Sequence, residues 1–327
     1  MSLRLEHLLE SGGFALPESG DIAVFGAVAG ADLAPLPKAR LRLVSRVKPD
    51  HDALVAAGYT VVERAPESAA LAVVLLPRAK ARARAMVAEA LALAGKAIID
   101  GQKHDGIDGL LREMRARTVC SEPYSKAHGK IFVAEAGDFA DWAQAGEPGR
   151  NADGFVTAPG VFSADGIDPG SRLLAGALPL SLKGHVADFG AGWGYLATEI
   201  LKREGVETLD LVEADGAALD CAKANVSDAR ARFHWADATR WRPDAPLDAV
   251  VMNPPFHEGR KGVPELGQAF IRNAAASLAP AGRLYMVANR HLPYEAVLGE
   301  VFREVAEIGG DSRFKLLQAA RPARKGR

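Results

Sequence analysis

The sequence predicts two successive α/β domains, each built on a mostly parallel sheet that ends in an antiparallel hairpin. Short apolar runs typical of buried strands alternate with segments of helical periodicity, as they do in βαβ units. This order occurs twice along the chain, and 327 residues are more than one small core usually takes. The segment Gly146–Asp153, which contains glycine, proline and polar residues, is the best candidate for a linker between the two domains.

The first half contains five expected strands before its hairpin. They lie at Asp21–Gly26, Leu41–Val44, Tyr59–Val62, Leu71–Leu76 and Ala97–Asp100. Apolar residues at helical spacing and possible caps predict helices between these strands, at Asp50–Gly58, Ala79–Ala94 and Gly109–Arg115. Two further strand-like segments are expected to form the closing hairpin, at Thr118–Cys120 and Lys130–Ala134.

The second half repeats this order with stronger signals. Its expected strands lie at Val186–Phe189, Thr208–Val212, Ala231–Trp235, Leu247–Met252 and Leu284–Ala288. The helices expected between them lie at Tyr195–Glu204, Ala217–Asn225 and Leu266–Leu278. The segment Arg313–Gln318 is expected to be the last member of a terminal hairpin.

Composition narrows the class of protein. Apolar residues make up 48% and charged residues 25% of the chain, which is ordinary for a soluble globular protein. No apolar run approaches the roughly 18 residues of a membrane helix, and the N-terminus lacks an export signal. The two cysteines, Cys120 and Cys221, lie far apart, so neither a disulfide scaffold nor a metal site is expected. We therefore expect a cytoplasmic protein that uses no metal and contacts no membrane. The net charge of −1 argues against bulk coating of nucleic acid, although it permits a local basic patch.

The clearest motif is V-A-D-F-G-A-G-W-G-Y-L, which begins at Val186. Asp188 ends a strand there, and the three glycines that follow allow a turn whose backbone approaches a ligand closely. A dinucleotide fingerprint would require a small residue where Tyr195 stands. Asp188 is therefore interpreted as a carboxylate that binds the ammonium group of a ligand. A purely structural tight turn is the alternative.

Two further carboxylates follow the next strands. Glu213 ends the second strand, where it can accept hydrogen bonds from ribose hydroxyls of either NAD or S-adenosylmethionine. Asp215 is a competitor for this role, but it is better placed to cap the next helix. Asp237, in W-A-D-A, can accept a hydrogen bond from an adenine amino group. The alternative for Asp237 is an ordinary surface loop residue.

The most informative motif is N-P-P-F, which starts at Asn253 directly after the buried fourth strand. The Asn253 side-chain oxygen and the Pro254 carbonyl can both accept hydrogen bonds from an exocyclic amine of a nucleic-acid base. Acceptors in this position favour the positive charge that builds on the amine nitrogen as it attacks a methyl group. Phe256 can stack on the base, and His257 is expected to line the pocket. The motif therefore predicts N-methylation of a planar amine.

The order D-x-G-x-G-x-G, acidic strand end, N-P-P-F-H resembles class I S-adenosylmethionine-dependent methyltransferases of the small-domain type. It is closest to the ribosomal RNA guanine-N2 methyltransferases of the small-subunit methyltransferase C kind. The resemblance covers Gly154 to about Ala320, and three further stretches support it: Pro159–Ser163 with Asp168–Leu174, Val287–Glu295 and Ser312–Lys315.

This resemblance implies two tandem Rossmann-like methyltransferase folds. Residues 1–150 would form a degenerate N-terminal domain and residues 154–327 the catalytic domain. The first half fits this picture, because it has no acidic residue two places before Gly26 and has Leu76-Pro77-Arg78 where the second half has N-P-P-F. The implied cofactor is S-adenosylmethionine, and the implied partner is ribosomal RNA, foremost 16S rRNA, or a ribosomal subunit.

The expected site residues fall into two groups. The catalytic group is Asn253, Pro254 and Phe256. The cofactor-binding group is Asp188, Gly190, Ala191, Gly192, Glu213, Asp237, Ala238 and Asn253.

Other functions remain open from the sequence. Adenine-N6 and protein-glutamine methyltransferases use similar N-P-P loops. Phe256, the histidine that follows it and the duplicated first half favour guanine-N2. A Rossmann oxidoreductase and a non-enzymatic RNA-binding scaffold are the rivals from other classes, and the oligomeric state is not predicted.

Overall fold

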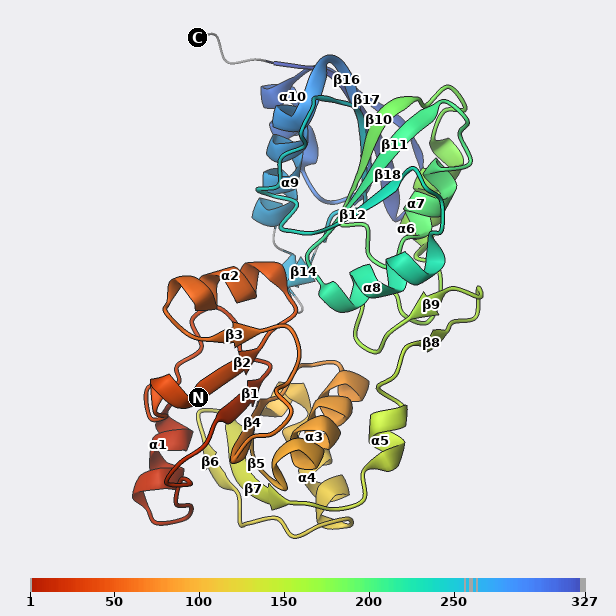
Figure 1. Cartoon of the computed structure of the whole chain (residues 1–327). Helices are drawn as coiled ribbons and strands as arrows, with labels where there is room; N and C mark the ends of the chain where they lie inside the picture. The colour runs from red at the N-terminus through yellow and green to blue at the C-terminus, as the bar shows by residue number, and fades with distance from the viewer. Residues whose placement is uncertain (1, 256, 259–260, 263, 324–327) are drawn as a thin grey trace. The chain divides into compact units, whose positions relative to one another are not determined.

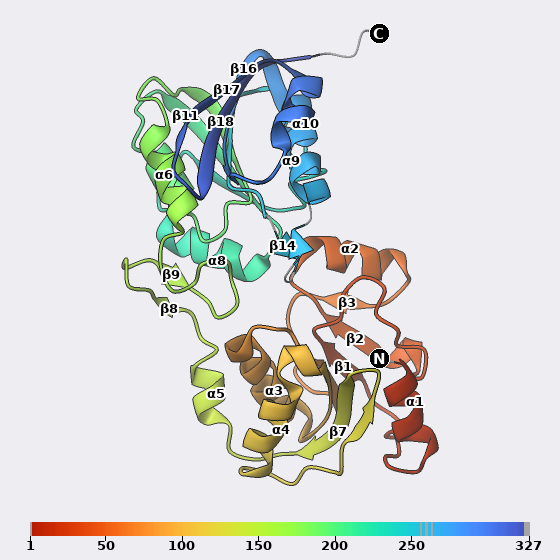
Figure 2. The same cartoon turned by 180° about the vertical axis from the view of Figure 1, so that it is seen from behind.

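The computed structural model describes residues 2–255, 257–258, 261–262 and 264–323, and it contains two compact units (Figure 1). Unit 1 consists of Met1–Pro148 with Ala158–Gly160, and unit 2 of Gly149–Thr157 with Val161–Arg327. Each unit contains its own seven-stranded sheet, and the view from behind shows helices on both faces of each sheet (Figure 2).

The sheet of unit 1 has the strand order β3-β2-β1-β4-β5-β7-β6. The first five strands are parallel, and β7 runs antiparallel to β5 and β6. The strands are β1 (Ile22–Phe25), β2 (Leu41–Val44), β3 (Val61–Val62), β4 (Leu71–Leu75), β5 (Lys96–Gln102), β6 (Tyr124–Lys126) and β7 (Gly129–Glu135). The helices are α1 (Ser2–Glu10), α2 (Lys48–Ala56), α3 (Lys80–Ala94), α4 (Ile107–Arg115) and α5 (Ala140–Gln144), with 3-10 turns η1 (Lys38–Arg40) and η2 (Lys103–Asp105).

The sheet of unit 2 has the corresponding order, β12-β11-β10-β13-β16-β18-β17. Its strands are β10 (Gly184–Phe189), β11 (Val206–Glu213), β12 (Ala231–Trp235), β13 (Leu247–Met252), β16 (Leu278–Asn289), β17 (Phe302–Gly310) and β18 (Phe314–Pro322). Its helices are α6 (Pro169–Ala177), α7 (Tyr195–Ile200), α8 (Gly216–Asn225), α9 (Pro264–Ser277) and α10 (Tyr294–Val301). Two small ribbons accompany it, β8 (Gly149–Arg150) with β9 (Val156–Thr157), and β14 (His257–Glu258) with β15 (Lys261–Gly262). The repeated topology confirms the predicted fold class.

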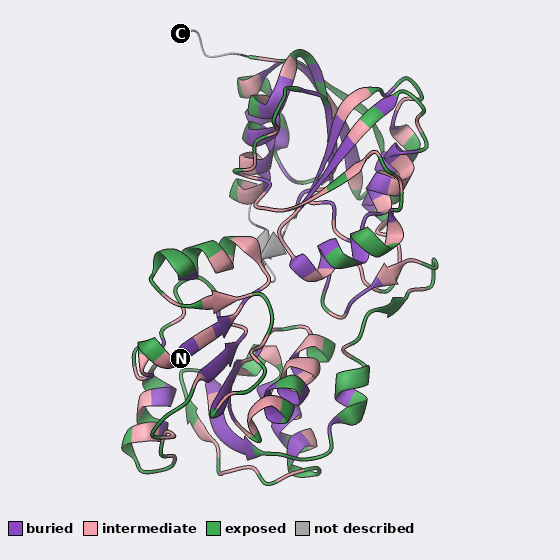
Figure 3. Ribbon diagram, in the orientation of Figure 1, coloured by how far each residue is buried: buried purple, intermediate pink, exposed green. Residues whose placement is uncertain are grey.

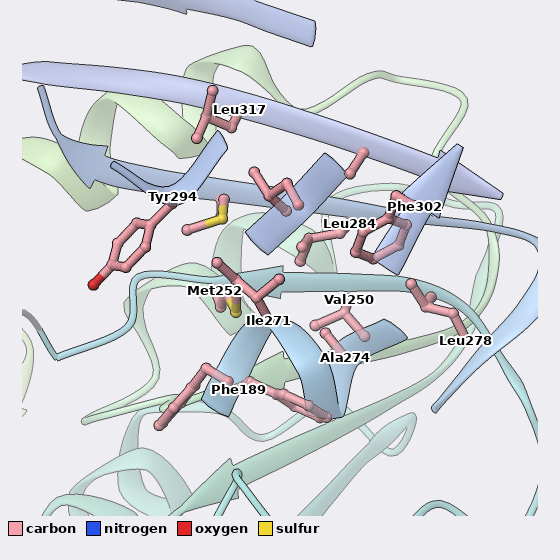
Figure 4. Packing of buried hydrophobic residues seen from close by; sticks show 14 of the residues in the cluster. Phe189, Val250, Met252, Ile271, Ala274, Leu278, Leu284, Tyr294, Phe302 and Leu317 are labelled. Carbon is pink, nitrogen blue, oxygen red and sulfur yellow. The ribbon is translucent and has the colours of Figure 1, made fainter. Parts of the chain in front are cut away.

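Side chains along the central strands of unit 2 alternate between two different layers. These strands are largely buried, as the colouring in Figure 3 shows. Phe189, Val250 and Met252 pack against α9 and α10 together with Ile271 and Ala274, as Figure 4 shows. The opposite face of the same strands packs against α6, α7 and α8 through a second buried cluster. The carboxyl edge between these two layers is where the sequence motifs converge.

The closing hairpin of unit 1 differs from the expectation. Cys120 forms only an isolated bridge to Ala134, so the predicted strand Thr118–Cys120 was wrong. The hairpin partner is Tyr124–Lys126, joined to β7 through Ala127 and His128, which have φ values of 48° and 56°. A two-residue hairpin of this kind usually contains Asn-Gly or Asp-Gly. Its turn therefore carried no recognisable sequence signal.

In unit 2 some elements differ in length from the prediction, and others were not predicted. The helix α7 ends at Ile200, before the predicted end at Glu204, β16 begins at Leu278, and β18 extends to Pro322. The helices α6 and α10, the strand β17 and the short strands β8, β9, β14 and β15 were missed. After its first residue β17 is exposed at every position, so it lacks the alternation that marks a strand.

Two further observations concern the chain as far as it is described. No helix there combines the length and the apolarity needed to cross a membrane. Within the same residues, no group of three or more histidine, cysteine, aspartate or glutamate side chains is arranged to hold a metal ion.

Candidate active site

The glycine turn connects β10 to α7 at the carboxyl edge of the unit 2 sheet. Gly190 and Gly192 have φ values of +75° and +55°, which side-chain-bearing residues rarely adopt. The Gly190 amide donates to the Val212 carbonyl at 2.8 Å, which fixes the turn against the end of β11. A Cβ atom on Gly192 would meet no other atom within 4 Å. The backbone of the turn is therefore rigidly held while one side of it stays open.

Asp188 lies just before this turn and is completely buried. It is paired in register with Leu211 and Val251, and it points to the same face of β10 as Val186, which packs against α6–α8. Neither carboxylate oxygen has a hydrogen-bond partner among the described residues. Burial, followed by the nearby charge of Glu213, raises the pKa of Asp188 to about 8. The free protein therefore holds a carboxyl group that lacks the compensation a buried charge normally requires.

Glu213 connects the end of β11 to the glycine turn. One carboxylate oxygen accepts the Gly192 amide at 2.8 Å, and the other accepts the Asp215 amide at 2.7 Å. Burial raises the pKa of Glu213, opposed by these amide hydrogen bonds. Asp215 accepts the Ala217 amide and caps α8, as its sequence position suggested.

Asp237 follows β12 and forms a local turn. Its Oδ1 atom accepts the Thr239 amide at 2.8 Å and the Thr239 hydroxyl at 2.6 Å. Ala238 is buried, and its carbonyl accepts a hydrogen bond from the Asn273 side chain at 2.7 Å. These contacts give Asp237 a structural role in its own loop and leave its second oxygen 3.9 Å from Arg240 Nε.

Asn253 extends from the end of β13, and its side-chain amide is held at one end only. The Nδ2 atom donates to Asp168 Oδ2 at 3.0 Å and to Ser171 Oγ at 2.8 Å. The Oδ1 atom is buried and has no hydrogen-bond partner in the described part of the chain. A buried acceptor left unpaired costs about 1–3 kcal/mol, so the arrangement points to a ligand that donates to it.

Several predicted residues line one pocket. Asn253 shares it with the turn residues Gly190, Ala191 and Gly192. The other lining residues were not predicted as site residues: Phe162, Ser163, Asp168, Ser171, Trp193, Tyr195 and Leu196. The turn and the asparagine were thus predicted from the sequence, whereas the wall that α6 and the preceding loop provide was missed.

Five other predicted residues do not line this pocket. Asp188, Glu213, Asp237, Ala238 and Pro254 are absent from its lining. Glu213 still contacts the pocket through the Gly192 amide. Pro254 is buried beside Asn253. Phe256 lies outside the described residues, as does the side chain of His257.

Asn225, at the end of α8, is a further residue that was not predicted. Its side chain accepts the Val156 amide and donates to the carbonyls of Val156 and Trp193, each at 2.8 Å. These bonds fix the glycine turn from its helical side. No local pattern signals this role, because Asn225 lies 69 residues from Val156 in the sequence.

The corresponding edge of unit 1 carries different side chains. The pairing registers place Val24, Ser45 and Leu75 where unit 2 has Asp188, Glu213 and Asn253. The turn is also closed. A Cβ on Gly26 would lie 2.2 Å from the Leu75 carbonyl oxygen and 2.9 Å from the Met86 side chain, whereas the nearest neighbour for Gly190 is Phe270 at 3.5 Å.

Residues 153–318, about half of the chain, match the family model described as methyltransferase small domain. The chain belongs to this methyltransferase family. Its unit 2 has the fold, the glycine turn and the asparagine loop that the family resemblance implied.

Curated relatives carry a more specific name. The chain is 36% identical over 174 residues to the ribosomal RNA small subunit methyltransferase C of Pectobacterium atrosepticum, a match that covers 52% of this chain and 50% of that relative. The protein of the same name from Shewanella halifaxensis is 29% identical, over 76% of this chain and 77% of the relative. The first match thus spans only about half of the relative's length.

A solved structure matches both units. It is a T. thermophilus 16S rRNA N2 methyltransferase in complex with AdoMet and guanosine. The match has a TM-score of 0.75 and 25% sequence identity, and it covers 94% of this chain and 90% of that chain. The resemblance inferred from the sequence is therefore confirmed by family, by relatives and by fold.

Proposed function

We propose that unit 2 binds S-adenosylmethionine and methylates the exocyclic N2 amine of a guanine in ribosomal RNA, foremost 16S rRNA. The observation that carries this proposal is the orientation of Asn253, which lines a pocket together with the glycine turn: its amide nitrogen is held by Asp168 and Ser171, and its oxygen has no partner among the described residues. The names of the relatives and of the matching solved structure support the same activity and substrate.

The residues at the carboxyl edge fit S-adenosylmethionine. Asp188 is an unpaired buried carboxylate suited to an ammonium group, and Gly192 provides backbone that a ligand can approach. Glu213 would hold the ribose hydroxyls, and Asp237 and Ala238 the adenine. When bound, S-adenosylmethionine supplies a methyl group activated by its sulfonium. The protein contributes binding and orientation.

The amine is the part of the reaction on which the chain acts directly. The guanine N2 lone pair is delocalised into the ring, so the free amine is a poor nucleophile. Asn253 Oδ1 and the Pro254 carbonyl would accept hydrogen bonds from its N–H groups, which favours the charge that develops on nitrogen as the N–C bond forms. Once the nitrogen is cationic its proton is acidic enough to leave to solvent. Phe256 would stack on the base, which must be unpaired to enter the pocket.

We propose that unit 1 is a degenerate copy that does not bind the cofactor, with the domain boundaries near residues 150 and 154. Its turn at Gly26 packs against the end of β4, and apolar residues replace two of the three polar site residues. On α3, Lys80 and Arg84 both pair with Glu113. Unit 1 would then contribute substrate binding or stability. We also propose that the protein acts in the cytoplasm.

The test is methyl transfer with nucleoside analysis. The full chain is incubated with tritiated S-adenosylmethionine and, separately, undermethylated 16S rRNA, the small ribosomal subunit and a glutamine-bearing release factor. We expect label in RNA and its recovery as N2-methylguanosine. Recovery as N6-methyladenosine would replace the base assignment, and label in the release factor alone would contradict the RNA assignment.

A further inference from the structure

We propose that Asp168 and Ser171 are positioning residues that make the site specific for an amine, because they decide which end of the Asn253 amide faces the substrate. This inference rests on the proposed function. It concerns whether the Asn253 amide presents its oxygen or its nitrogen to the substrate. Residues far from Asn253 in the sequence determine this choice.

The oxygen and the nitrogen of an asparagine amide have nearly the same size, so hydrogen-bond partners alone determine its orientation. Asp168 Oδ2 already accepts the Ser171 amide at 2.8 Å, so this oxygen faces Asn253 as a hydrogen-bond acceptor. With the amide reversed, Asn253 Oδ1 would lie about 3.0 Å from the Asp168 carboxylate oxygen. Two acceptors at that distance repel each other, and the buried hydrogen bond would be lost. The Asp168 contact therefore keeps the Asn253 nitrogen directed at the start of α6.

The two partners of Asn253 are themselves held in place by the start of α6. Asp168 caps this helix, because its Oδ2 atom accepts the Ser171 amide at 2.8 Å. Pro169 occupies the first turn, where its ring fixes the backbone in the helical range. Ser171 is only 7% exposed, and Leu174 one turn further packs in the core. The same carboxylate oxygen thus serves both the helix and Asn253.

With the nitrogen held by Asp168 and Ser171, the oxygen of Asn253 is left as an acceptor that is unpaired among the described residues. Asn253 Oδ1 is buried and lacks a partner within the described residues, in a pocket that Asp168 and Ser171 also line. Such an atom is satisfied by an N–H group and opposes a carbonyl oxygen. A reversed amide would present N–H groups and favour a carbonyl instead. The start of α6 therefore selects a purine amine over a purine carbonyl at the reacting position.

The central experiment compares rates in two backgrounds. Ser171→Ala should lower kcat about three- to tenfold, as loss of one neutral hydrogen bond predicts. Asp168→Ser keeps a helix-capping hydroxyl but is too short to reach Asn253, and it should lower kcat about ten- to hundredfold. The dissociation constant for S-adenosylmethionine should stay within about twofold in both variants. Ser277→Ala, which removes a buried hydroxyl with no described partner at the far end of α9, is the matched control.

Nonadditivity separates positioning from general stability. In an Asn253→Ala background, Ser171→Ala and Asp168→Ser should cause no further loss of rate, because the group they orient is gone. Losses of the same size in both backgrounds would overturn the proposal. So would a wild-type rate in Asp168→Ser.

A second measurement does not depend on methyl transfer. In ¹⁵N-labelled full-length protein, the Asn253 side-chain amide signal is assigned by its absence in Asn253→Ala. Its two protons should exchange slowly with solvent in the wild type and at least about tenfold faster in Ser171→Ala, with no change in Ser277→Ala. Equal exchange in all three proteins would refute the positioning role. If the wild type fails to methylate RNA while the amide shows this protection, the proposed function falls and the orientation of Asn253 stands.

Discussion

Replacing Asp188 with asparagine tests whether the buried carboxylate is retained for ligand binding at the expense of the free protein. Burial raises the pKa of Asp188 from 3.8 to about 8. Well below pH 3.8, the carboxyl group is protonated in both folded and unfolded chains, so it costs nothing. As the pH rises, the unfolded chain releases this proton while the folded protein keeps it, and the folded state loses stability until the pH reaches about 8.

The magnitude follows from the pKa difference. Each pH unit between the two pKa values costs about 1.4 kcal/mol, so the wild type carries a penalty of about 4 kcal/mol at pH 7. Asparagine has nearly the same shape and no proton to lose. Its buried amide N–H groups add a cost of about 1–3 kcal/mol that does not vary with pH. The free energy of unfolding of Asp188→Asn minus that of the wild type should therefore rise by about 4 kcal/mol between pH 5 and pH 8.

Urea unfolding of both proteins across this range measures the difference, and all other titrating groups cancel in the subtraction. A difference that stays constant with pH would show that Asp188 is ionised in the free protein and would refute the reasoning. A merely lower stability at every pH, with no trend, is the same negative result.

Folding favours the protonated form of Asp188, whereas binding of S-adenosylmethionine should favour its ionised form. An ammonium group needs the ionised carboxylate, so S-adenosylmethionine binding to the wild type at pH 6.5 should release about one proton from Asp188. Calorimetry in buffers of different ionisation enthalpy measures this release. Asp188→Asn should show no such proton release. It should also bind the ligand about ten- to hundredfold more weakly, as expected for loss of a charged hydrogen bond. Unchanged affinity and unchanged proton release would exclude Asp188 from the binding site.

Three further predictions concern single residues. Asn253→Ala should lower the single-turnover methylation rate about 10²- to 10³-fold with cofactor affinity within about twofold, and equal losses in both would contradict a catalytic role. Glu213→Gln should weaken S-adenosylmethionine binding about tenfold in titration calorimetry, because the ribose loses a charged acceptor; an unchanged dissociation constant would exclude that contact. Gly267→Ala should lower the melting temperature by several degrees, since its Cβ would lie 2.0 Å from the hydroxyl oxygen of the fully buried Tyr294; a wild-type melting temperature would show that α9 can shift.

The sheet cores were predictable because they rest on local patterns. The strand around Val250 is a short apolar run that ends at a proline pair, and the glycine turn follows a strand in a fixed spacing. Each of these signals lies within about ten consecutive residues. The repeated order of strands in the two halves then determined the fold class.

The wall of the pocket was not predictable in the same way. Asp168 lies 85 residues from Asn253, and Ser171 lies 82 residues from it, so no periodicity or spacing joins them. A partial signal existed, because Asp168 followed by Pro169 and then Ser171 is a typical helix start. It would have predicted α6. Only the fold, which brings the start of that helix to the residue after β13, reveals that its cap also holds the asparagine.

Comparison of the two units shows that the site residues lower the stability of the free protein. This loss of stability indicates a function. Both sheets have one topology, and their central strands are equally buried, so the fold does not require an acidic residue at the end of the central strand. Unit 1 has Val24 there, which packs without any penalty, whereas unit 2 has Asp188 with neither oxygen paired among the described residues. Buried polar atoms without partners are rare because each destabilises the folded state. Two of them at Asp188 and a third at Asn253, on one sheet edge beside an open glycine turn, are therefore explained by ligands rather than by folding.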